Sequence, residues 1–158
     1  MLAECGADLE VRDYEGERGT LEMAAAKGHF EVFKFLEGKG VKVSDKILLK
    51  ELLHGEKMDV ESTSLLQHLV DRNPDYLANN ESKLFTLSKE GKFSQLEALI
   101  KVGANVHAKN AEGQSLLDVV GTDESWHSWH ARNDKKWPKQ VEKMKIVLEK
   151  AMKKKIKK

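Results

Sequence analysis

Apolar residues recur at helical spacing in several blocks of this 158-residue chain, and glycines follow the clearest of them. The most regular block runs from Leu21 to Leu36, with Gly28 in its middle and Gly40 behind it. Between the two glycines the apolar positions include 32, 33, 35 and 36, as expected for one buried face of a helix. The pattern predicts a helix, a turn at Gly28, a second helix and a stop at Gly40.

The spacing of the glycines indicates that this pair of helices is repeated. Gly28 and Gly40 are twelve residues apart, and so are Gly91 and Gly103. Gly6 stands 34 residues before Gly40 and Gly103 stands 63 after it, close to two periods of about 33 residues. The first glycine of each pair is expected to end a helix in the left-handed conformation, which glycine adopts without strain. We therefore expect stacked two-helix repeats, stabilised by contacts between neighbours.

Two kinds of motif resemble the ankyrin repeat. Gly-Ala-Asp-Leu at 6–9 and Gly-Ala-Asn-Val at 103–106 resemble the ends of its repeats, and Leu-x-x-Ala-Ala-x-x-Gly-His-x-Glu-Val at 21–32 resembles its helical core. The resemblance covers about residues 1–120 and implies an all-α fold, an ankyrin-like helical solenoid with irregular repeats. In this family a short inner helix pairs with a longer outer helix. Loops or β-hairpin fingers join the repeats, which leaves a concave binding face.

The expected organisation has three parts. The first consists of a partial repeat at 1–12, repeats at 13–43, 44–74 and 75–109, and the start of a last repeat at 110–121. A tryptophan-rich insertion follows at 122–137. A C-terminal basic helix at 138–158 is expected to complete or cap the last repeat, with an apolar side made by Val141, Met144, Val147, Leu148, Ala151 and Met152.

Two features of the helix ends depart from the ankyrin pattern. The family's Thr-Pro-Leu-His helix start is absent, although Ser82 and Ser115 are suited to cap the helices expected there. Residues 2–6 resemble the end of an outer helix without its partner helix, so that an apolar end is exposed. We expect a monomer unless this exposed end pairs with another molecule.

The third expected repeat also has an altered layout. Its helices are expected at 46–54 and 64–72, with Gly55 and Asn73 at the two glycine positions. That alignment leaves no room for a finger before the first helix and places six extra residues between the helices. Residues 57–63 are therefore expected to form a bulge.

Composition agrees with helices that have solvated outer faces. The chain is 40% hydrophobic and 34% charged but only 6% aromatic. Its single cysteine, Cys5, excludes an intramolecular disulfide and is typical of a reducing compartment. We expect a cytoplasmic location without a membrane span. Since degenerate ankyrin-like repeats also occur in effectors that reach host cells, the host cytoplasm or nucleus is included in this expectation.

Positive charge gathers at the C-terminal end. Beyond residue 134 there are eleven lysines against Glu142 and Glu149, a balance of +9, which leaves −8 on the rest of the chain because the total is +1. The segment from Lys150 to Lys158 has an interpretation as a contact for nucleic acid or an anionic membrane, and another as a nuclear import signal. It is equally a solvated helix end whose lysines face the negative end of the helix dipole.

The insertion holds the most unusual local composition, with Trp126 and Trp129 beside His127 and His130. Its tryptophans suit contact with a partner, but they also suit folding back to cover the end of the stack. The two histidines have the spacing of a metal pair but no evident third ligand, so that no metal site is predicted. The chain also lacks nucleophile, phosphate-loop and paired-carboxylate motifs, and we expect neither catalysis nor a cofactor.

The predicted function is that of a non-catalytic adaptor or scaffold that binds another protein. The ankyrin resemblance implies contacts from finger tips and from exposed positions of inner helices. The first finger contributes Tyr14, Glu15, Glu17 and Arg18, and the second contributes Lys109, Ala111, Glu112 and Gln114. The inner helices contribute Glu22, Met23, Lys27 and Thr86, and the insertion adds Trp126 and Trp129. Binding of nucleic acid or anionic membrane through the lysine-rich end is the alternative.

Overall fold

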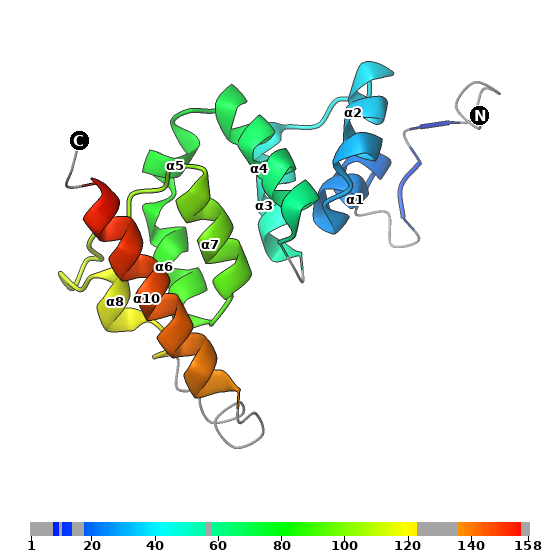
Figure 1. Cartoon of the computed structure of the whole chain (residues 1–158). Helices are drawn as coiled ribbons and strands as arrows, with labels where there is room; N and C mark the ends of the chain where they lie inside the picture. Colours follow the sequence, from blue (N-terminus) through cyan, green and yellow to red (C-terminus); the bar gives the residue numbers. More distant parts are fainter. Residues whose placement is uncertain (1–7, 10, 14–17, 56–57, 123–135, 156–158) are drawn as a thin grey trace. The chain divides into compact units, whose positions relative to one another are not determined.

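The computed structural model describes residues 8–9, 11–13, 18–55, 58–122 and 136–155 (Figure 1). Within these ranges the chain is all-helical, with nine helices and, in place of strands, two isolated β-bridges. No helix in the described part of the chain combines the length and the apolar character needed to cross a bilayer. The helices fall into two compact units that divide between Asn73 and Pro74, next to the repeat boundary expected after residue 74.

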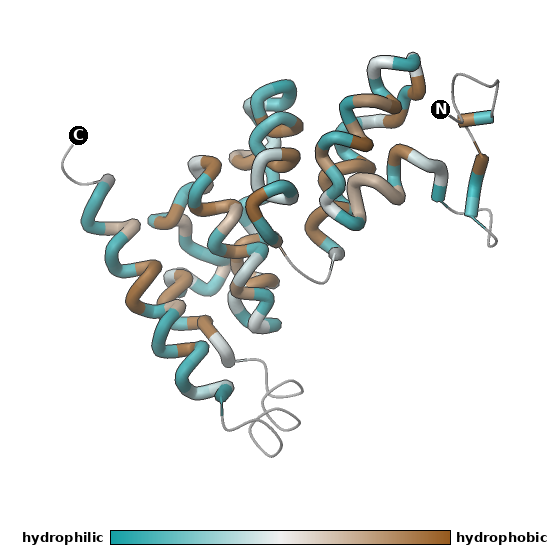
Figure 2. The backbone as a smooth tube through the Cα atoms, turned by 45° about the vertical axis from the view of Figure 1, so that its right-hand side comes forward, coloured by the Kyte–Doolittle hydropathy of each residue, from teal (hydrophilic) through white to brown (hydrophobic). Residues whose placement is uncertain are grey.

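The first unit holds four helices, which are α1 (Thr20–Lys27), α2 (Phe30–Gly38), α3 (Asp45–His54) and α4 (Val60–Arg72). Helix α1 packs against α2 and α3, and α4 packs against α3 and α2. Figure 2 shows hydrophobic and hydrophilic residues alternating along the helices. The core side chains of this unit include Leu21, Ala25, Phe33, Leu36, Leu49, Leu53, Leu65 and Leu69.

The glycines behave as their spacing predicted. Gly28, Gly40, Gly91 and Gly103 all have positive φ, at 72°, 91°, 71° and 106°. Gly28 also lies against α4, because a Cβ built at this position would stand 1.9 Å from the hydroxyl oxygen of Ser62. The left-handed conformation predicted for the first glycine of each pair is therefore confirmed at Gly28 and Gly91, and Gly28 has a packing role in addition. Gly40 and Gly103 also have positive φ, which was not predicted for them.

The helix boundaries of α4 correct one prediction. Val60 to Thr63 do not bulge, since they form the first turn of α4, four residues before the expected start. The carboxylate of Asp59 caps this turn by accepting hydrogen bonds from the backbone N–H of Ser62 at 2.8 Å and from its hydroxyl at 2.9 Å. The same bonds hold the pKa of Asp59 below its usual range. An aspartate three residues before a serine was thus the missed start signal.

Gly55 ends α3 as predicted but does so without a left-handed conformation, at φ −54°. Glycine is needed here because a larger residue would clash: a Cβ at this position would stand 2.7 Å from the carbonyl oxygen of Ala26. Asn73, assigned to the second glycine position, has φ −131° and is likewise not left-handed. The third expected repeat therefore keeps its two helices but not the glycine geometry of the repeat at 13–43, which holds Gly28 and Gly40.

A polar network holds the end of α4 against α2 and α3. Arg72 forms ion pairs with Glu37 of α2 and, at 3.1 Å, with Asp45 at the start of α3. The side chain of Asn73 donates a hydrogen bond to Asp45 at 2.6 Å. His68 lies one turn before Arg72, 3.3 Å from the Glu37 carboxylate. Together these contacts fix the C-terminal end of α4 within the first unit.

The second unit holds α5 (Tyr76–Asn79), α6 (Glu81–Lys89), α7 (Phe93–Lys101), α8 (Leu116–Val119) and α10 (Trp137–Lys155). Helix α6 packs against α7 and α8, and α10 packs against the same two helices, α7 and α8 (Figure 1). Met144 and Leu148 are buried on the predicted apolar side of α10. The C-terminal helix therefore covers α7 and α8, as a capping helix does.

Trp137 corrects the boundary of the tryptophan-rich insertion. The insertion is expected to end at residue 137, but Trp137 belongs to α10 and is only 3% exposed. Its ring stacks on Phe93 of α7, with centroids 5.4 Å apart. Trp137 therefore covers the core of the second unit. A covering role was one of the two interpretations of the tryptophans in the insertion.

An isolated β-bridge lies at the place of each expected finger. The bridges pair Arg12 with Gly19 and Lys109 with Ser115, immediately before α1 and α8. Next to them, the backbone N–H of Asp13 donates to the carbonyl of Arg18 at 2.8 Å, and that of Asn110 donates to the carbonyl of Gln114 at 3.0 Å. Residues 41–44, before α3, form no such pair, in agreement with the finger expected to be absent there.

One of the two serine caps is confirmed. The backbone N–H and the hydroxyl of Ser115 donate to the Asp118 carboxylate at 2.8 and 2.7 Å in a capping box, which lowers the pKa of Asp118. The prediction for Ser82 is wrong, because α6 begins at Glu81 with Asn80 before it. An additional short helix, α5, explains the shift, since it runs almost directly into α6 and leaves no extended residue at the expected cap.

Candidate functional site

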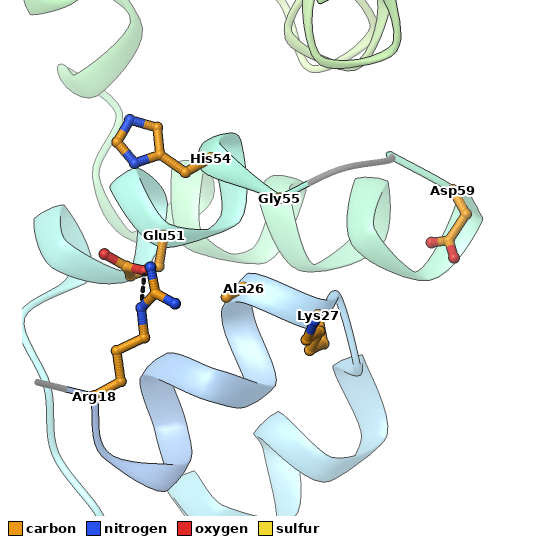
Figure 3. A pocket seen from close by; sticks show the side chains of 7 residues that line it. All are labelled: Arg18, Ala26, Lys27, Glu51, His54, Gly55 and Asp59. Atoms are coloured by element: carbon orange, nitrogen blue, oxygen red, sulfur yellow. Dashed lines mark ion pairs between the residues drawn. The ribbon is translucent and has the colours of Figure 1, made fainter. Parts of the chain in front are cut away.

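A recess of about 360 Å³ lies in the first unit, where the C-terminal ends of α1 and α3 come together (Figure 3). It is lined by a mixture of charged, small and polar residues, namely Arg18, Ala26, Lys27, Glu51, His54, Gly55 and Asp59. Two of these residues, Arg18 and Lys27, are among the partner contacts predicted from the sequence.

Local sequence positions each side of the recess. Ala26 and Lys27 form the last turn of α1, which ends because Gly28 takes the left-handed conformation. Glu51 and His54 are three residues apart on α3 and therefore share one helix face. The absence of a side chain at Gly55 lets the end of α3 approach the backbone of Ala26.

An ion pair forms one wall of the recess. Nε of Arg18 lies 2.8 Å from Oε2 of Glu51, as the dashed line in Figure 3 shows. The Arg18 side chain is 48% exposed, whereas that of Glu51 is only 12% exposed. Oε2 of Glu51 is enclosed and accepts no aligned hydrogen bond, so the neighbouring guanidinium is its main compensation. The largely enclosed Glu51 carboxylate thus holds the guanidinium of Arg18 in place at the surface.

The charges around the recess are balanced rather than of one sign. Arg18 and Lys27 are cationic, whereas Glu51 and Asp59 are anionic. Asp59 is ionised near neutral pH because its pKa is lowered by its bonds to Ser62. Such a surface offers positions for both acidic and basic groups, an arrangement that favours the mixed surface of another protein over a polyanion.

Removing Arg18 should expose the dependence of Glu51 on it. We expect Arg18→Ala to lower the free energy of unfolding of the first unit by about 1–3 kcal/mol, because an enclosed carboxylate loses its counter-charge while the arginine itself is half exposed. Urea unfolding followed by circular dichroism measures this loss. The double variant Arg18→Ala/Glu51→Gln removes the isolated charge and should recover most of the stability. Equal losses in the single and double variants would contradict the role given to the pair.

The other predicted contacts of the first unit differ in accessibility. Met23 is 45% exposed on α1, one helix turn before Lys27, so both side chains lie on the same side of the helix. Glu22 is only 8% exposed, and its carboxylate lies 2.7 Å from the place that a Cβ at Gly19 would take. Glu22 therefore belongs to the interior at the start of α1 and does not fit the contact role predicted for it.

The predicted contacts of the second unit include both exposed and structural side chains. Thr86 on α6 is exposed, and so are Lys109, Ala111 and Glu112 at the place of the second expected finger. Gln114 is half-buried, and its backbone N–H and side chain are both bonded to the Asn110 side chain. It therefore holds the turn in shape.

Several predicted contacts lie outside the described residues. They are Tyr14, Glu15 and Glu17 of the first finger, Trp126 and Trp129 of the insertion with its two histidines, and the last three residues of the lysine-rich end. Among the described residues, no group of three or more histidine, cysteine, aspartate or glutamate side chains is placed to hold a metal ion.

The sequence interpretation missed the far wall of the recess. Glu51 and His54 line the recess with Arg18 and Lys27 because α3 packs beside α1, and Asp59 joins them from the start of α4. Asp59 had a usable signal, because it stands three residues before Ser62 at a helix start. Nothing in the spacing of Glu51 and His54 singles them out.

Comparison with protein-family models, with curated proteins and with solved structures gives no match for this chain.

Proposed function

We propose that this chain is a non-catalytic adaptor or scaffold built from ankyrin-like repeats, which binds a partner protein through the exposed side of α1 and the adjoining recess. One observation carries the proposal. Arg18 and Lys27, which the ankyrin resemblance implies as contacts, line one recess of mixed charge, and Met23 is exposed one turn before Lys27.

The chemistry of this surface supports a protein partner. Arginine and methionine are enriched in protein interfaces, where an apolar contact is surrounded by polar groups. Arg18 is held by Glu51, which reduces the conformational freedom it would lose on binding. The balanced charges then favour a partner with groups of both signs facing them.

The test replaces one apolar residue and one lysine on α1 and makes the same changes on α2. Met23→Ala/Lys27→Glu should reduce recovery of the partner by at least about tenfold, since an apolar contact and a charge are both lost. Val32→Ala/Lys34→Glu, at exposed positions of α2, is the matched control and should recover the partner as the wild type does. Quantitative affinity purification from cells expressing the chain measures both.

The two variants distinguish an effect at the α1 surface from a general effect on the first unit. Equal loss from the α1 and α2 variants would assign the effect to charge or stability in general. Unchanged recovery by the α1 variant would remove α1 from the binding surface. Either result would overturn the assignment of this face.

A further inference from the structure

A groove of about 830 Å³ lies in the second unit, between the C-terminal ends of α7 and α10. Its apolar part combines the end of α7, the segment that follows it and the last turns of α10. The residues are Ile100, Ala104, Val106 and Ala151. Ala104 and Val106 are each 2% exposed and belong to the core, whereas Ile100 and Ala151 are partly accessible. The groove thus has a firm apolar wall.

The rest of the groove is cationic. Four exposed lysines line it, Lys101 from α7 and Lys150, Lys153 and Lys154 from α10, and none of the described residues in the lining carries a carboxylate. Lys101 forms an ion pair with Glu97 at 3.2 Å. The three lysines of α10 form no ion pair with any residue that the structure describes. Their spacing of three and four places them on neighbouring positions of the helix surface.

We propose that this groove binds an acidic amphipathic helix of a partner protein. Apolar side chains of that helix pack on the wall formed by Ile100 and Ala151, and its carboxylates face the lysines of α10. The charge favours an acidic ligand, because the residues described in the lining offer four positive groups and no negative one. The inference goes beyond the proposed function, since it adds a second surface in the other unit and states the chemistry of its ligand.

The same observations disfavour a polyanion and a bilayer. Single-stranded nucleic acid is held by aromatic stacking together with cations, and the groove has no aromatic side chain among its described lining residues. A helix that binds a bilayer must present an apolar face to it, whereas α10 buries Met144 and Leu148 against its own unit. A helix of opposite charge satisfies both the apolar wall and the lysines.

A designed peptide tests the proposal on the full chain. The probe is a fluorescein-labelled peptide of about 18 residues, or roughly five helical turns, with leucines at helical spacing and glutamates flanking them. Fluorescence anisotropy should show saturable binding in the micromolar range. A peptide of the same composition in scrambled order, and one with lysine in place of glutamate, should each bind at least about tenfold more weakly, since they lack the apolar stripe or the charge.

Two matched variants locate the binding. Lys150→Glu/Lys153→Glu should weaken the peptide about tenfold or more, whereas Lys139→Glu/Lys143→Glu, at exposed positions earlier on α10, should change it by less than about twofold. Ala151→Glu, which places a charge on the apolar wall, should also weaken binding about tenfold. Circular dichroism of each variant confirms that the helices are retained.

Three results would overturn the proposal. They are equal weakening by both lysine pairs, equal binding of the scrambled peptide, and displacement of the probe by single-stranded DNA or phosphatidylserine vesicles at lower concentration than by unlabelled peptide. The variant Met23→Ala/Lys27→Glu should bind the peptide normally. Failure of the groove and failure of the α1 surface are therefore separate outcomes.

Discussion

Trp137→Ala is expected to lower the free energy of unfolding of the second unit by about 3–5 kcal/mol, the usual range for deleting a buried tryptophan. The ring is almost fully enclosed and stacks on Phe93 with an angle of 19° between the planes. Stacked aromatic pairs contribute about 0.5–1.5 kcal/mol beyond their burial. The variant removes both contributions at the point where α10 begins to cover α7.

Urea unfolding combined with hydrogen exchange of α7 and α10 measures this effect within the second unit. Trp137→Phe keeps an aromatic ring over Phe93 and should cost less, about 1–2 kcal/mol. Ile146→Ala is the control on the same helix, because that side chain is 44% exposed and should change stability by no more than about 0.5 kcal/mol. A similar loss for Trp137→Ala and Ile146→Ala would argue against the covering role of the tryptophan.

Gly28→Ala is expected to destabilise the first unit by about 2–4 kcal/mol, from backbone strain and overpacking together. An alanine at φ 72° is strained by about 1–2 kcal/mol. The added Cβ would also stand 1.9 Å from the Ser62 hydroxyl oxygen and 2.9 Å from its Cβ. That hydroxyl already donates to Asp59, so moving it disturbs the cap of α4.

Gly40→Ala separates these two contributions. Gly40 has φ 91°, but nothing lies within 4 Å of a Cβ built there. Its replacement should therefore show the strain alone, about 1–2 kcal/mol by the same chemical or thermal unfolding measurement. If the two variants lost equal stability, the close contact between Gly28 and α4 would have no energetic weight.

The parts of the fold that the sequence predicted are those governed by local rules. Glycine is favoured at a left-handed helix end, so this conformation could be predicted for Gly28 and Gly91 from their spacing. The apolar side of α10 follows from its helical periodicity, which places Met144 and Leu148 inside.

The two boundary errors have different causes. The start of α4 has a local signal that was missed, Asp59 three residues before Ser62. The start of α10 depends on tertiary packing, because Trp137 stacks on Phe93 of a helix far away in the sequence. The candidate recess shows the same division. The contact roles of Arg18 and Lys27 are implied by the ankyrin resemblance. Glu51 contacts Arg18 across 33 residues of sequence, and no local pattern marks that pairing.

Asp59 belongs to two structures at once, the wall of the recess and the first turn of α4. Binding and local folding are linked equilibria. A ligand that contacts the ionised Asp59 only in its capping geometry therefore stabilises the first turn of α4. By reciprocity, the formed turn adds the same free energy to the affinity for that ligand. Occupancy of the recess would then be reported by amide protection at the beginning of α4, beyond the residues the ligand touches. In this way a helix cap becomes a thermodynamic coupling point between recognition and the integrity of its helix.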